Sequence, residues 1–284
     1  MLLNNKNPTE VPTLNTWCAN SVSRITVNSE PLILAIDTAT RAGSVALARG
    51  AKLLHLQTGD KEASHSIDLI ATVEAALNAI GAKLREVELF AAASGPGSFT
   101  GLRIGIATIK SFAMSVGKPC VGVPTLAATA HAAGTSVCTV ALLPAGRGEV
   151  FAQMFSVDAG RVRPLDAAAH LSPAAVMEKY RSSESLTWAG EGAHLNARAL
   201  CDHAKAVGIA WHDRDSQSLA RSMGWMLAPR RDELAGSVAA LAFEEYCAGR
   251  TTSPGELRAI YVRPSDAEIN QQWQSEKSQL PATH

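Results

Sequence analysis

The chain has 284 residues, of which 46% are hydrophobic and 18% charged, enough apolar material for one large domain or two smaller ones. Its formal net charge is zero, which excludes a global basic field that would recruit nucleic acid or an anionic membrane. No apolar segment reaches the roughly 18 to 20 residues of a membrane helix, and the five cysteines form no C-x-x-C pair. We therefore expect a soluble, cytoplasmic globular protein with reduced thiols and no metal site.

The N-terminal region, residues 1–30, is polar and lacks the continuous apolar segment of a secretion signal, so we expect either a disordered extension or an overlong start there. Three adjacent strands are predicted next, over 32–36, 44–49 and 52–57. The first of them is a continuous apolar run, which is typical of a strand covered on both faces. It ends at Asp37, so a carboxylate lies at the end of a buried strand.

Two amphipathic helices are predicted on either side of a further strand. Apolar residues at helical spacing place the first helix over 64–80 and the second over 100–116, with strands over 89–93 and 119–123. This alternation of strands and helices predicts an α/β fold. The side chains expected to face the sheet from the first helix are Ile67, Ile70, Val73, Leu77 and Ile80.

A glycine-rich loop, residues 94–105, leads into the second helix. Its four glycines remove the side-chain barrier to unusual φ values and to close backbone contact, and Ser98 or Thr100 can cap the helix. Two interpretations stay open: unpaired amides at the helix start can hold a phosphate, or the loop is a strand-to-helix turn. The pattern matches neither of the two common nucleotide-loop motifs. The residues that we place near a candidate nucleotide are Asp37, Gly95, Gly97, Ser98, Thr100 and Gly101.

The second half of the chain repeats a strand-turn-strand pattern. A short alanine-rich helix over 125–133 leads to strands over 137–143 and 149–157, which are predicted to form a hairpin. The apolar run before Pro144 echoes the run before Asp37, which hints at a duplicated α/β unit. Later predicted elements are helices over 172–180, 194–206 and 237–247, a strand over 185–189, an extended segment over 259–263 and a polar tail from residue 264.

We divide the chain into an N-terminal extension, a first α/β subdomain at 31–135, a second at 136–250 and a C-terminal tail at 251–284. The last helix is a candidate for packing back on the first subdomain.

Seven short segments of the sequence match those of a known family: 34–38, 44–47, 65–66, 94–105, 121–126, 148–151 and 261–263. With these segments the chain resembles the bacterial TsaB (YeaZ) family over residues 32–263, and 95–105 is the most specific part.

The resemblance implies two actin/Hsp70-like (ASKHA, ribonuclease H-like) α/β subdomains. It also implies a role in forming N6-threonylcarbamoyladenosine at position 37 of tRNAs that read ANN codons. The family is described as peptidase M22-like or as glycoprotease homologues, yet it implies a non-catalytic partner of the catalytic subunit TsaD, together with the ATPase TsaE. The resemblance implies that tRNA is reached indirectly and that this chain alone binds no cofactor; ATP or ADP in the complex stays open.

The resemblance also implies that two helices of the first subdomain pack against the catalytic subunit as a helical bundle, and that the same face can make a homodimer when the partner is missing. Off the main apolar stripe, the second helix carries small and apolar residues, and alanines on the first helix allow close approach. The candidate interface residues are His65, Ala71, Ala75, Ala79, Arg103, Ile104, Thr108, Ser111 and Phe112.

Catalysis by this chain alone has little support from its residues. A catalytic member of this superfamily needs a metal site, usually with a histidine pair on one helix, and none of the eight histidines forms H-x-x-x-H or H-E-x-x-H. In actin-like sites both hairpins tend to supply a carboxylate, but the second has Pro144 where the first has Asp37. A protease trio of Ser98, His65 and Asp37 lacks the G-x-S-x-G context. The alternatives are a stand-alone ATP-dependent transferase, an M22-type peptidase and a sugar-kinase-like enzyme.

Overall fold

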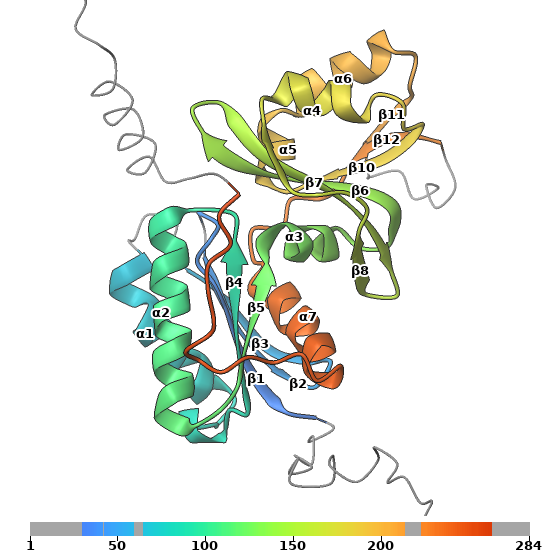
Figure 1. The fold of residues 1–284 in the computed structure, drawn as a ribbon. Helices are drawn as coiled ribbons and strands as arrows, with labels where there is room; N and C mark the ends of the chain where they lie inside the picture. The colour runs from blue at the N-terminus through green and yellow to red at the C-terminus, as the bar shows by residue number, and fades with distance from the viewer. Residues whose placement is uncertain (1–29, 42, 60–64, 214–222, 263–284) are drawn as a thin grey trace, which may run out of the picture.

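Two β-sheets, each with its own helices, organise the computed structural model, which describes residues 30–41, 43–59, 65–213 and 223–262 (Figure 1). The α/β class predicted from the sequence is confirmed. The predicted N-terminal extension, apart from Glu30, and the tail from residue 263 lie outside the described residues. No helix within the described ranges is long and apolar enough to cross a membrane.

The first sheet has five strands in the order β3-β2-β1-β4-β5. Pairing is antiparallel among the first three strands of the chain and parallel from β1 to β4 and from β4 to β5. β1 and β4 are buried along their whole length, as their continuous apolar sequences predict. The strands are β1 Leu32–Asp37, β2 Ser44–Arg49, β3 Lys52–Thr58, β4 Leu89–Gly95 and β5 Cys120–Pro124.

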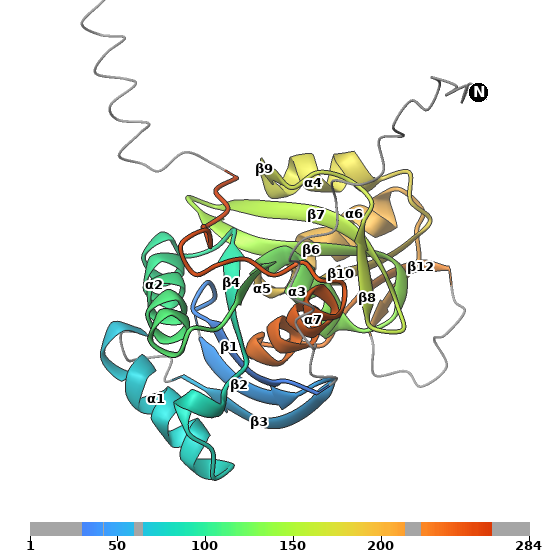
Figure 2. The ribbon, with the colours of Figure 1, turned by 60° about the horizontal axis from the view of Figure 1, so that its bottom comes forward.

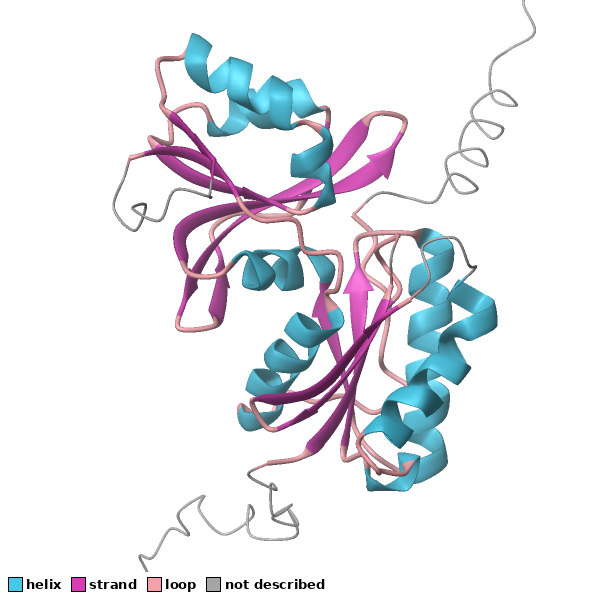
Figure 3. Ribbon diagram, turned by 180° about the vertical axis from the view of Figure 1, so that it is seen from behind, coloured by secondary structure: helices cyan, strands magenta, loops and turns pink. Residues whose placement is uncertain are grey.

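Helices cover both faces of this sheet (Figures 2 and 3). On β1, Leu34 and Ile36 belong to the core beneath α1 and α2, whereas Ile33 and Ala35 belong to the core beneath α7. This split follows from the two-residue period of a strand, which points alternate side chains to opposite faces. The helices are α1 His65–Ala79, α2 Phe99–Val116 and α7 Ala235–Cys247, while α3 Thr125–Ala133 lies between the two sheets.

One part of the predicted apolar stripe of α1 is wrong. Ile70, expected to face the sheet, is 65% exposed, and its neighbour Leu69 is buried instead. Leu69, Val73 and Leu77 recur at spacings of four residues and make the sheet-facing stripe, so the helix is rotated relative to the prediction. The side chain of Ile67 lies outside the described residues.

The second sheet has seven strands, in the order β11-β12-β10-β6-β7-β8, with β9 paired to β7. The predicted hairpin is confirmed as β6 and β7, where Pro144 pairs with Val150. Trp188 and Trp225, on neighbouring strands, are fully buried in its core. The elements are β6 Ser136–Gly146, β7 Glu149–Asp158, β8 Arg161–Pro164, β9 Ala169–Leu171, β10 Ser185–Ala189, β11 Trp211–Asp213, β12 Gly224–Leu227, α4 Pro173–Tyr180, α5 Glu191–Leu195 and α6 Ala197–Ala206.

The later part of the chain differs from its prediction in two ways. The helix predicted over 194–206 is two helices, α5 and α6, which meet at Asn196. The strands β8, β9, β11 and β12 were not predicted, because each has only three or four residues and too few positions to show a period. The segment predicted as extended over 259–263 belongs to neither sheet in its described part, 259–262, and its extended conformation stays a prediction.

Candidate functional site

The glycine-rich loop packs directly against the turn that follows β1. A Cβ atom on Gly101 would overlap the carbonyl oxygen of Thr38, and one on Gly97 would lie 2.6 Å from the carbonyl oxygen of Ala39. The hydroxyl of Thr38 also donates a hydrogen bond of 2.7 Å to the carbonyl oxygen of Gly101. These glycines are therefore required because two backbone segments touch, which is the turn interpretation of the loop.

Several amides of the loop donate hydrogen bonds within the fold. Ser98 N donates to the carbonyl oxygen of Ala39 at 2.9 Å, and Gly95 N donates to Thr125 Oγ1 at 3.1 Å. Ser98 Oγ accepts from Gly101 N at 3.2 Å, so Ser98 is the N-cap of α2, while Thr100 is exposed in its first turn. Three of the donors that a phosphate would use are thus already engaged.

Asp37 is fully buried at the end of β1. Its Oδ1 accepts from Ala39 N at 2.8 Å, and its Oδ2 accepts from the hydroxyl of Thr40. The carboxylate therefore holds the turn against which the glycine loop packs. The side chain of His65 lies outside the described residues, so the geometry of the trio Ser98, His65 and Asp37 stays a sequence hypothesis.

The outward faces of α1 and α2 lie side by side, away from the sheet (Figure 2). The predicted interface alanines Ala71, Ala75 and Ala79 are exposed on α1, and Arg103 and Ser111 are exposed on α2. Such small residues leave the backbone of α1 open to close approach by another helix. Three further predicted residues on α2 are half-buried: Ile104, Thr108 and Phe112. Ile104 and Phe112 also pack against the core beneath the helices.

Comparisons with known proteins cover most of the chain. Residues 60–211 match a family model described as "TsaD: tRNA N6-adenosine threonylcarbamoyltransferase". The "tRNA threonylcarbamoyladenosine biosynthesis protein TsaB" of Escherichia coli is 28% identical over 236 residues, which are 81% of this chain and 94% of that protein. An uncharacterized protein of Mycobacterium tuberculosis is 32% identical over 156 residues, 54% of this chain and 71% of that protein. The chain belongs to the TsaB/YeaZ family.

Solved structures support the fold of this TsaB/YeaZ chain. "YeaZ from Pseudomonas aeruginosa" superposes with a TM-score of 0.62 at 24% identity, over 81% of this chain and 99% of that one. A second structure, described as similar to peptidase YEAZ from the same organism, gives a TM-score of 0.64 over 82% of this chain. The family resemblance, and the two-lobed actin-like (ASKHA) architecture that it implies, are confirmed.

Between the two lobes of this family member lies a small pocket. It measures about 20 Å³, far below the roughly 300 Å³ at which small-molecule sites begin. Gly190 is part of its lining, and a Cβ atom there would overlap the carbonyl oxygen of Leu142 and lie 2.7 Å from Cγ2 of Thr129. As it stands, this pocket would have to open to admit a nucleotide. Its lining residues are Thr40, Arg41, Thr129, Leu143, Gly190, Glu191, Arg231, Asp232 and Leu234.

Sequence reasoning missed the largest exposed apolar side chains near the helical face. Met114, on α2, is 67% exposed, and Ile70 at the edge of α1 is nearly as exposed. Met114 could have been found, because it follows Ser111 by three residues on the same helix face. Ile70 was assigned to the buried stripe. Phe99 and Tyr261 were not considered as surface residues, because their proximity depends on the path of the C-terminal segment.

Proposed function

We propose that this chain acts in the biosynthesis of tRNA threonylcarbamoyladenosine as a non-catalytic activator that binds a TsaD-type catalytic subunit. The likeness to the Escherichia coli biosynthesis protein TsaB supports the pathway, because it spans 94% of that protein. The observation that carries the partner-binding part is the exposed face of small residues on α1, beside a face of α2 on which Arg103 and Ser111 are exposed. A helix of the partner can approach such a face to a short interaxial distance.

The size of this face is adequate for a stable complex. α1 has 15 residues and α2 has 18, so each presents roughly 22 to 27 Å of helix to a partner. A specific interface needs about 1,000 Å² or more of buried surface, which two such helices can supply against a matching pair. When the catalytic subunit is absent, the same face would pair two copies of this chain.

The non-catalytic part of the proposal is supported by the second hairpin. Pro144 stands at the end of the apolar run of β6, in the place that Asp37 occupies on β1, so this hairpin offers neither a carboxylate nor a backbone donor there. Catalysis, nucleotide handling and tRNA contact then fall to the catalytic subunit and a TsaE-type ATPase. The proposed location is the cytoplasm, where the tRNA substrate is modified.

A charge in the middle of the α1 face tests the proposal. Ala75→Glu keeps a good helix former but places a carboxylate where two helices would pack, so we expect binding to the TsaD-type subunit of the same organism to weaken at least tenfold. Ala199→Glu, at an exposed alanine of α6 on the other lobe, is the matched control and should bind normally. The measurement is isothermal titration of the purified proteins, with thermal melting to show that both variants fold. Normal binding by a folded Ala75→Glu variant would refute the assigned face.

A further inference from the structure

The C-terminal segment 254–261, which we name the strap, runs alongside α2 from its C-terminal end to its N-terminal end (Figures 1 and 2). Lys110 Nζ donates to the carbonyl oxygen of Leu257 at 3.4 Å, midway along the helix. At the far end the ring of Tyr261 lies 5.4 Å from the ring of Phe99. The strap therefore borders α2 on the side opposite α1.

The strap is held firmly in this position. Leu257 is buried in the core beneath α1 and α2. Ile260 N donates to the carbonyl oxygen of Ser94 at 2.6 Å, and a Cβ atom on Gly95 would overlap the carbonyl oxygen of Ile260. The glycine at position 95 is therefore needed for the strap to lie against the end of β4. Side chains that point outward from the strap are presented in a fixed arrangement, which lowers the entropic cost of binding.

The exposed side chains along this border are large and of the types that dominate binding energies. Tyr261 is 48% exposed and Phe99 is 37% exposed. The guanidinium carbon of Arg103 lies 3.9 Å from the centre of the Phe99 ring. Tyrosine and arginine are enriched among interface residues whose truncation is costly. The α1 face, by contrast, offers mainly alanines, which permit close approach but bury little area.

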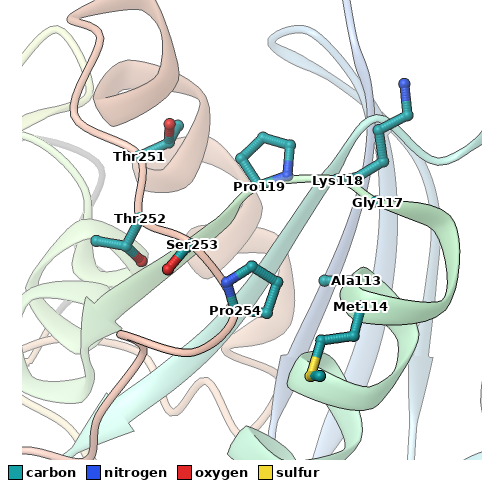
Figure 4. A pocket seen from close by; sticks show the side chains of 9 residues that line it. All are labelled: Ala113, Met114, Gly117, Lys118, Pro119, Thr251, Thr252, Ser253 and Pro254. Atoms are coloured by element: carbon teal, nitrogen blue, oxygen red, sulfur yellow. The ribbon is translucent and has the colours of Figure 1, made fainter.

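An open groove marks the other end of the same border (Figure 4). It has a volume of about 520 Å³ and lies between the C-terminal end of α2 and the start of the strap. Met114 projects beside it, and Pro254 faces α2 from the strap. The groove is continuous with the exposed face of α2 through Met114, which lies one turn beyond Ser111. Its lining residues are Ala113, Met114, Gly117, Lys118, Pro119, Thr251, Thr252, Ser253 and Pro254.

We propose that the footprint of the catalytic partner continues across α2 onto the strap, with Phe99, Tyr261 and Met114 as its apolar anchors. This inference rests on the proposed function, since it assigns a second half to the same partner surface. The partner would present an apolar surface to these anchors and a carboxylate or carbonyl oxygen to Arg103. Phe99 and Met114, near the two ends of α2, and Tyr261 on the strap thereby supply the large side chains that the alanine face of α1 lacks.

Truncation of the anchors tests this extension, with the TsaD-type subunit of the same organism as the probe. We expect Tyr261→Ala and Met114→Ala each to weaken binding about tenfold, an effect larger than most interface residues show on truncation. Tyr261→Phe should bind within about twofold of the unchanged chain, because the ring supplies the contact. Leu195→Ala is the matched control, because Leu195 is 67% exposed but lies on the other lobe.

The outcomes separate this inference from the proposed function. Tyr261→Ala could weaken binding merely by loosening the strap, but Met114→Ala could not, since Met114 lies on α2. Thermal melting checks that every variant folds. Binding by both truncated variants within twofold of the unchanged chain, with Ala75→Glu defective, would overturn the extension and keep the α1 and α2 face. Defects at Tyr261 and Met114 with normal binding by Ala75→Glu would support the strap surface and overturn the α1 assignment. No binding by the unchanged chain would overturn both.

Discussion

Gly101 lies where α2 comes closest to the turn after β1, and no side chain fits between the two segments. A methyl group there would overlap the carbonyl oxygen of Thr38. The contact also carries the hydrogen bond from the Thr38 hydroxyl, so relief of the clash would break that bond. The position of α2 on the sheet, and with it the helical face, thus depends on this residue.

Gly101→Ala should destabilise the chain by about 3 kcal/mol or more, because a rigid backbone contact must move to admit the methyl group. The control is Gly236→Ala in α7, where a Cβ atom would meet only Leu53 side-chain atoms, at 3.7 and 3.9 Å. That substitution should be neutral or stabilise by up to about 1 kcal/mol, because alanine is the better helix former. Urea unfolding of both variants measures the difference. A Gly101→Ala variant as stable as the unchanged chain would contradict the packing described for the loop.

Asp166 is the residue of the second lobe with the clearest link to pH. Burial opposes its ionisation, but hydrogen bonds from Lys179, Tyr180 and the Met154 amide outweigh burial and hold the pKa of the carboxyl below its usual value. Because the pKa of the Asp166 carboxyl is lower in the folded chain than in the unfolded chain, its ionised form stabilises the fold at pH values above its unfolded-state pKa of about 3.9. This stabilisation is lost as the pH falls through the pKa of the carboxyl in the folded chain.

Asp166→Asn should therefore lower the free energy of unfolding by about 2 kcal/mol near neutral pH, since charge-assisted hydrogen bonds are replaced by weaker ones. The difference in the free energy of unfolding between the unchanged chain and Asp166→Asn should narrow as the pH falls below about 4. Urea unfolding as a function of pH measures it. Asp202→Asn serves as control, because the exposed Asp202 lies 3.8 Å from Arg198 in a pair expected to contribute less than about 1 kcal/mol. A difference that stays constant with pH would contradict the pKa assigned to Asp166.

At the scale of elements, α2 begins at a defined cap. Ser98→Ala removes the oxygen that accepts from Gly101 N and should cost about 1 kcal/mol of stability. Ser111→Ala, inside the same helix, should be neutral or slightly stabilising, because the Ser111 hydroxyl only bonds back to the carbonyl oxygen of Ala107. Thermal unfolding of both variants compares them. Equal stability of the two alanine variants would mean that Ser98 does not cap the helix.

Elements with long periodic patterns could be predicted, and short ones could not. The strands and helices from β1 to β7 follow the predicted order because each has an apolar run or a helical period long enough to identify it. β9 has only three residues and gains its place by pairing with β7, a contact that no local pattern encodes. The error at Ile70 has a related cause: Leu69 and Ile70 are adjacent and apolar, and only the packing partner decides which faces the sheet.

The candidate site was predictable only where it depends on local sequence. The small residues of α1 and α2 and the cap at Ser98 could be recognised from spacing along one helix. Whether the glycine loop holds a phosphate or packs on backbone depended on Thr38 and Ala39, which approach it only in the folded chain. The surface shared by Phe99 and Tyr261 joins residues far apart in the sequence, so it required the path of the strap.

At the scale of the whole molecule, two lobes meet around α3 and α7 (Figure 3). His131 Nδ1 and Ser237 Oγ, 3.0 Å apart, join these helices. α7 follows the second sheet in the chain yet packs on β1, β2 and β4 of the first. This arrangement leaves the outward face of α1 and α2 at the edge of the molecule, away from the lobe junction, where a partner subunit can reach it without separating the lobes (Figure 1).

The most direct test of the central claim is threonylcarbamoyladenosine formation on tRNA in a reconstituted mixture, with the complete set of proteins compared with a set that lacks only this chain. If this chain is an activator subunit, product is lost when the chain is omitted and restored when it is added back, while the chain alone gives no turnover. Full product without the chain would contradict the activator role, and turnover by the chain alone would contradict its non-catalytic character.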